Sequence, residues 1–117
     1  MQARHSDSVA FTPVTSEGAV GCRMRELVTA ADGAPTFAMR QFEVAPGGNT
    51  PFHEHPWEHE VFVLSGEGSV RTAGGPRRIA AGDAVLVPPG ETHSFVSSGE
   101  HPLVFLCMVP VAQSCCR

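Results

Sequence analysis

Four histidines are the residues of this chain whose type and spacing indicate chemistry. They are His53, His55, His59 and His93. The first three fall within seven residues and share odd parity, so an extended chain directs them to one face, with Pro56 bending the path between them. Imidazole is the side chain that most often binds first-row transition metals at neutral pH. The spacing therefore predicts a metal site rather than a merely polar loop.

Three familiar patterns, two of metal ligands and one of cysteines, do not fit this chain. A zinc finger needs paired ligands in two short clusters, and a metalloprotease needs its His-Glu-x-x-His on a helix, which Pro56 and the Val61–Val63 run oppose. The spacing of the four cysteines is not that of a disulfide framework. Cys22 and Cys107 lie in apolar strand patterns and are expected in the core, whereas no function is assigned to the adjacent Cys115 and Cys116.

Composition and charge exclude several partners. The chain has 117 residues, enough for one domain, and a formal charge of −4. Its eight cationic residues are scattered arginines without a basic stripe, so nucleic acid is not an expected partner. No apolar run reaches the length of a membrane span, and residues 1–20 lack the apolar segment of a secretory signal. We therefore expect no membrane contact and a cytoplasmic location.

Turn signals recur every six to twelve residues, and no helical period appears. This pattern is typical of an all-β sandwich or barrel. The interpretation divides the chain into an N-terminal arm (1–20), a barrel (21–112) and a C-terminal tail (113–117). The expected strands are 22–30, 36–45, 60–65, 69–73, 77–81, 84–87, 91–97 and 103–109, with a short one at 9–11.

Two motifs in the chain resemble those of the cupin superfamily. The first comprises Gly47, His53-x-His55 and Gly66, and the second comprises Gly82, Pro88-x-Gly90, His93 and, in place of the usual Asn, Ser97. The match is strongest to small single-domain cupins of type 2 that carry His-x-His-Pro-Trp-Glu-His-Glu. The resemblance implies a single cupin barrel, which is a double-stranded β-helix or jelly roll, and a divalent metal, most often Mn or Fe. Imidazole ligands also suit Cu, Ni, Co and Zn.

The resemblance leaves two possible ligand sets. Counting back from Gly66, His59 occupies the position of the usual glutamate ligand, and its parity matches that of the preceding histidines. The alternative spacing brings Glu60 in as the ligand. We favour four histidines, with Glu58 and Glu60 either hydrogen-bonding the ligand imidazoles or facing solvent. Four neutral imidazoles leave the metal its full charge, which predicts a strong Lewis acid.

The residues expected to line the pocket come from the same strands. Val61 and Val63 share parity with His59, Phe95 shares parity with His93, and Phe105 and Cys107 belong to the last strand. The alternative is that all five are plain core. A small barrel of this type holds one small ligand at most.

Three functions follow from these features. The favoured one is a metal-dependent, oxygenase-like enzyme acting on a small organic molecule. The second is a non-catalytic module that binds a metal or small ligand, and the third is a metal-dependent isomerase or lyase, weakened because no general base is evident. Residues 103–109 are apolar on both faces, and Phe62 and Leu64 point away from the metal face. Together with the resemblance, this excess of apolar surface predicts a homodimer.

Overall fold

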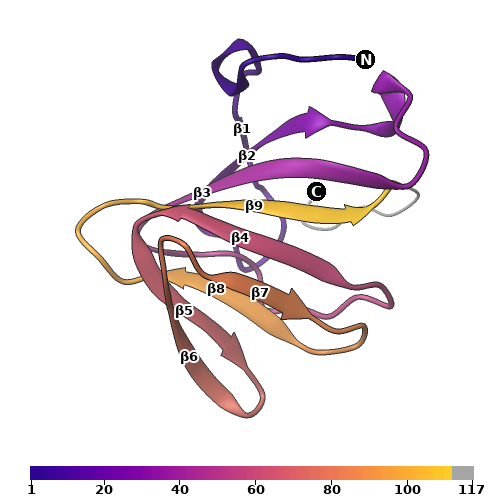
Figure 1. The fold of residues 1–117 in the computed structure, drawn as a ribbon. Coiled ribbons are helices and arrows are strands. Elements are labelled where there is room, and N and C mark those ends of the chain that lie inside the picture. Colours follow the sequence, from indigo (N-terminus) through magenta and orange to yellow (C-terminus); the bar gives the residue numbers. More distant parts are fainter. Residues whose placement is uncertain (112–117) are drawn as a thin grey trace.

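The computed structural model describes residues 1–111, which form a nine-stranded antiparallel sheet (Figure 1). The strands are β1 (Thr12–Pro13), β2 (Val20–Val28), β3 (Phe37–Asn49), β4 (His59–Ser65), β5 (Glu67–Thr72), β6 (Gly75–Ala80), β7 (Ala84–Val87), β8 (His93–Ser97) and β9 (Leu103–Pro110). Two single-turn 3₁₀ helices, η1 (Ser6–Ser8) and η2 (Ala30–Asp32), interrupt the early connections. The prediction of an all-β fold is confirmed. Within residues 1–111, no helix is long and apolar enough to cross a membrane.

The sheet curls into a half-barrel. Its main path runs β6-β5-β8-β3-β9-β4-β7, and β2 pairs with the remaining side of β3. In Figure 1, strands β2, β3, β9 and β4 form an upper layer, and β5 to β8 lie beneath it. Strands β6 and β7 end the main path, and β1 ends the branch that β2 forms from β3.

The interior between the layers follows the period-two alternation of the strands. Along β9, buried residues alternate with partly exposed ones from Leu103 to Pro110. The Phe105 ring of β9 stacks on Phe42 of β3 at 5.3 Å between centroids and lies 4.7 Å from the Phe95 ring of β8. Aromatic contacts therefore join three strands below the histidines and hold the layers in register.

Two strand boundaries differ from the sequence prediction. Strand β3 continues to Asn49 through a predicted break, because a bulge lets Val20 of β2 pair with Asn49 and Gly47 adopts a positive φ of 80°. The short strand predicted at 9–11 is present just after that range, as β1 (Thr12–Pro13). Phe11 instead lies under the guanidinium groups of Arg23 and Arg25, at 4.1 and 4.2 Å, and strand pairing begins only at Thr12.

The other predicted strands are present with ends shifted by a few residues, and 84–87 has the predicted bounds. The division into arm, barrel and tail stays a prediction. Cys115, Cys116 and the 113–117 tail lie outside the described residues.

Gly66, the last residue of the first motif, connects β4 to β5 at a position that only glycine fits. Its φ is 83°, and a Cβ added there would clash with the carbonyl oxygen of Pro102. A left-handed backbone and a close backbone approach both exclude a side chain. The glycine in this motif therefore has a structural role.

We expect Gly66→Ala to lower the free energy of unfolding by more than about 1 kcal/mol, since it adds both backbone strain and a clash. Urea denaturation followed by circular dichroism measures the change. Gly74→Ala is the matched control, because a Cβ there meets only the Thr72 hydroxyl oxygen at 3.8 Å. Equal stabilities for the two variants would contradict the assignment.

Candidate metal centre

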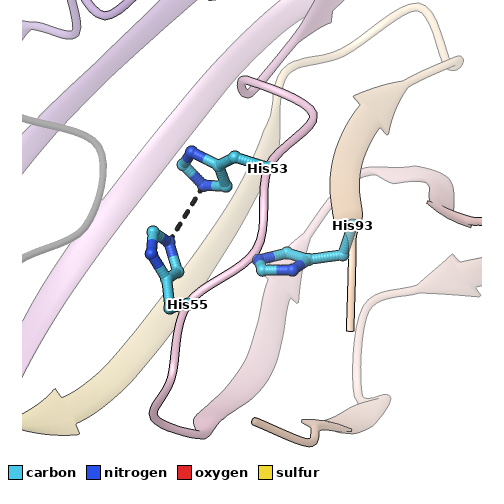
Figure 2. A group of neighbouring side chains, drawn as sticks. All are labelled: His53, His55 and His93. Atoms are coloured by element: carbon cyan, nitrogen blue, oxygen red, sulfur yellow. Dashed lines mark hydrogen bonds between the residues drawn. The ribbon is translucent and has the colours of Figure 1, made fainter. Parts of the chain in front are cut away.

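A reciprocal pair of backbone hydrogen bonds brings two distant segments together at the site. His53 N donates to His93 O at 3.1 Å, and His93 N donates to His53 O at 2.9 Å. His53 and His55 lie on the segment between β3 and β4, whereas His93 begins β8 (Figure 2). The bridge fixes the three side chains relative to one another even though 40 residues separate the segments.

Further hydrogen bonds hold both segments in place. Thr50 N donates to Phe95 O at 2.9 Å, Phe95 N donates to the Thr50 hydroxyl at 2.9 Å, and the Ser94 hydroxyl donates to Thr50 O at 2.6 Å. On the other side, Gly90 N donates to His55 O at 2.6 Å. The Pro-x-Gly corner of the second motif thus binds the backbone of the first, which explains why the motifs belong together.

The three imidazoles converge. One ring nitrogen from each of His53, His55 and His93 lies within 4.8 Å of the other two (Figure 2). The Nε2 atoms of His53 and His55 are 3.1 Å apart. Neighbouring ligand nitrogens of an octahedral ion are separated by about 3 Å, because each metal–nitrogen bond measures roughly 2.1 Å. The donor set and its spacing therefore fit a first-row divalent metal.

The orientation of His93 also suits metal binding. Its Nδ1 lies 2.9 Å from the carbonyl oxygen of Glu91, and a carbonyl can only accept a hydrogen bond. The hydrogen therefore sits on Nδ1, which leaves the lone pair on Nε2. A backbone acceptor is the usual device for fixing the tautomer of a ligand histidine.

His59, the fourth predicted ligand, lies beside this group without belonging to it. Its ring is 2% exposed, 4.9 Å from the His55 ring and 5.1 Å from the His93 ring between centroids. The ring nitrogens that lie within 4.8 Å of one another belong only to the three other histidines. Three of the four predicted ligands thus form a group, and the role of His59 stays a prediction. Glu60, the alternative ligand, is exposed on the opposite face of β4.

All five predicted pocket residues are buried in the hydrophobic core. They are Val61, Val63, Phe95, Phe105 and Cys107. Two of them contact histidines: the Phe95 ring lies 6.1 Å from the His93 ring, and Cys107 Sγ lies 3.3 Å from His59 Nδ1. Whether the five line a ligand pocket stays a prediction.

A cavity of about 620 Å³ includes His93 in its wall and lies along β5, β6 and β7. Arg77 and Glu91 also line it, and sequence reasoning missed both. They were missed because neither belongs to the spaced histidine motifs from which the site was predicted. The available signal was parity, since Arg77 shares its face of β6 with the buried Ile79 and pairs with the buried Val70 of β5.

Two other residues beside the site were not predicted. Arg40 is 2% exposed at an inward position of β3, between the buried Ala38 and Phe42, so the strand alternation could have identified it. Trp57 stacks on His55 with 4.7 Å between ring centroids and 10° between planes. No periodicity predicts this contact, because Trp57 lies in the irregular segment before β4.

The comparisons agree with the fold. The sequence model of the cupin domain family matches residues 40–109, and this chain belongs to that family. The fold is a single small cupin barrel, as predicted. The solved structure of the polyketide cyclase RemF from Streptomyces resistomycificus is similar, with a TM-score of 0.89 and 35% identity, covering 95% of this chain and 80% of that one.

Two curated relatives show how varied similar proteins are. The chain is 33% identical over 85 residues to a 1-methylthio-D-xylulose 5-phosphate methylsulfurylase from Rhodospirillum rubrum, covering 73% of this chain and 54% of that protein. It is 33% identical over 70 residues to an oxalate-binding protein from Thermotoga maritima, covering 59% and 58%. The chain thus spans little more than half the length of these two relatives.

Trp57 offers a direct optical test of the site. It is the only tryptophan and the chain has no tyrosine, so intrinsic fluorescence reports on the ring stacked against His55. We expect titration with Mn²⁺ or Co²⁺ to change this fluorescence in a saturable way. His55→Ala and His93→Ala should abolish the change, whereas His101→Ala, on the exposed connection before β9, should keep it. An unchanged titration in His93→Ala would contradict the site.

Proposed function

We propose that this chain is a metal-dependent enzyme acting on a small organic anion that reaches the histidine group through the His93 cavity. The observation that carries the proposal is the convergence of three imidazole donors, one of which, His93, also lines that cavity. A bound divalent ion would supply Lewis acidity to ligand oxygen atoms, and Mn or Fe, the ions we favour, would add redox activity.

Arg77 supports an anionic ligand. Arg77 and Arg78 both line the cavity, but Arg77 forms no ion pair within residues 1–111, whereas Arg78 lies 3.3 Å from the Glu67 carboxylate. A guanidinium group binds carboxylates and phosphates with two parallel hydrogen bonds. Three similar proteins are named for molecules that carry an anionic group: a sugar 5-phosphate, oxalate and dimethylsulfoniopropionate.

Two reaction classes fit the proposed site. The first is the oxygenase-like reaction, in which the metal positions left open by histidine bind oxygen and substrate. The second is proton transfer on a substrate polarised by the metal, as in a lyase, isomerase or cyclase. Glu91 favours this second class because it lines the same cavity as His93, and a carboxylate there would be a proton acceptor.

Oxygen uptake separates the two classes. With Mn- or Fe-loaded protein and a panel of small carboxylates and phosphorylated compounds, the oxygenase predicts oxygen consumption that stops when Zn replaces the metal. The second class predicts turnover without oxygen and a loss of about 10²-fold or more in Glu91→Gln. Arg77→Gln should raise KM in either case, with Arg71→Gln, exposed on the adjacent β5 and outside the cavity wall, as the control. Saturable binding of these anions with no turnover under any condition would contradict an enzyme and leave a ligand-binding module.

We propose His59 rather than Glu60 as the fourth metal ligand. The buried His59 ring lies within 5.1 Å of two ligand rings, and Glu60 faces outward. Because Nδ1 of His59 lies 3.3 Å from the sulfur of Cys107, Nε2 is the ring nitrogen that would bind the metal. Four neutral donors would leave the ion its full charge, which suits polarisation of an anionic oxygen ligand.

His59→Ala should therefore weaken metal retention by about 10-fold or more, and Glu60→Ala should change it little. Competition with a chromophoric chelator measures both. If Glu60→Ala weakened metal retention more than His59→Ala did, the four-histidine assignment would be contradicted and Glu60 would be the fourth ligand.

A homodimer and a cytoplasmic location also remain proposals. Phe62 and Leu64 of β4 are each 43% exposed, and Leu86 of the adjacent β7 is 61% exposed. Apolar side chains gathered on neighbouring strands are typical of a surface that a second copy covers.

A further inference from the structure

Cys107 of β9 contacts a histidine of the proposed site and a buried arginine at the same time. Its sulfur lies 3.3 Å from His59 Nδ1 and 3.3 Å from Arg40 Nη2. Arg40 of β3 and Val61 of β4 stand opposite Cys107 on its two sides, so the contacts cross three neighbouring strands. His59, Cys107 and Arg40 are 2%, 3% and 2% exposed, so water has almost no access to them.

The sulfur acts as a hydrogen-bond acceptor toward Arg40. A guanidinium group has donors only, and buried donors require acceptors. The other inward residues of β9 are Leu103, Phe105 and Val109, which offer packing but no acceptor. If position 107 only had to fill space, an apolar residue like these three would serve there. We therefore assign the Cys107 sulfur a polar role, as the acceptor for Arg40.

The geometry at His59 parallels that at His93. Nδ1 of His93 donates a hydrogen bond to the Glu91 carbonyl oxygen, so Nε2 is the nitrogen left to bind a metal. A metal on His59 Nε2 would likewise require the hydrogen to sit on Nδ1, where the atom within reach is Cys107 Sγ. The acceptor is usually a carboxylate, a carbonyl or water. Here a sulfur occupies that place.

We propose that Cys107 is a positioning residue for the metal site: its sulfur accepts the Nδ1 hydrogen of His59 and directs Nε2 to the metal, and Arg40 fixes the sulfur. The inference rests on the proposed role of His59 as a ligand. It assigns a function to a buried cysteine that would otherwise count as core.

Zinc affinity of the full chain tests the proposal, measured by chelator competition with Zn²⁺ as the probe. We expect Cys107→Ala to weaken binding by about 10- to 100-fold, the range found for lost partners of ligand histidines. Cys107→Ser keeps an acceptor and should stay within roughly 5-fold of the parent. Cys22→Ala removes another buried cysteine, from β2, and is the matched control. Thermal unfolding of each variant verifies that it folds.

A double-mutant cycle separates positioning from a general structural effect. In the His59→Ala background, Cys107→Ala should cause no further loss of zinc affinity. An equal loss with and without His59 would overturn the proposal, since the cysteine would then act through packing or by binding the metal itself. Nitrogen-15 correlation spectra of the imidazole rings provide a second readout: zinc-loaded protein should show His59 protonated at Nδ1, and Cys107→Ala should perturb that signal most among the histidines.

The two proposals fail in different ways. If His59→Ala leaves zinc affinity unchanged, His59 is not a ligand and both assignments fall. If His59→Ala weakens binding while Cys107→Ala matches the parent in affinity and in the His59 spectrum, only the role of Cys107 is overturned.

Discussion

The reciprocal backbone bridge between His53 and His93 is the constraint on which the rest of the site depends. It joins the segment before β4 to the first residue of β8, and the backbone alone makes it, at 2.9 and 3.1 Å. Because each histidine has both its N–H and its C=O in the bridge, the side chains leave the backbone in fixed directions. The Gly90 and Thr50 hydrogen bonds extend the same pairing on either side. Imidazole convergence is thus a property of strand pairing and needs no metal to create it.

Orientation of the rings adds a second level of preorganisation. His53 and His55 direct Nε2 toward each other, and His93 is held by a carbonyl at Nδ1. His59 has a sulfur at the same atom. In the proposed four-histidine site, all four rings would therefore bind the metal through the same nitrogen, Nε2. A set of identical neutral donors around one position gives a metal little charge compensation, which makes it effective at polarising an oxygen ligand. Under the proposed function, the cavity lined by His93 would give such a ligand a route to the ion.

Local sequence features predicted most of the fold and part of the site. Turn residues and alternating apolar residues predicted the strands, because both act over a few neighbouring positions. Motif spacing identified the three grouped histidines. The contact of Trp57 with His55 and that of Cys107 with Arg40 were not predictable, since each depends on chain direction or strand register set by distant pairing. Strand β3 extends to Asn49, beyond its predicted end at residue 45, because a β-bulge allows Asn49 to pair with β2. A bulge has no sharp sequence signal, so this extension was not predicted.

Metal content per chain is the measurement that tests the central claim most directly. Protein made without a histidine tag and without added metal would be analysed for transition elements, then again after reconstitution with Mn, Fe or Zn. The account predicts close to one transition-metal ion per chain, removed by chelators and restored on reconstitution. A folded chain that retains no transition metal, even after reconstitution, would contradict it and make the histidine group a structural feature of the barrel.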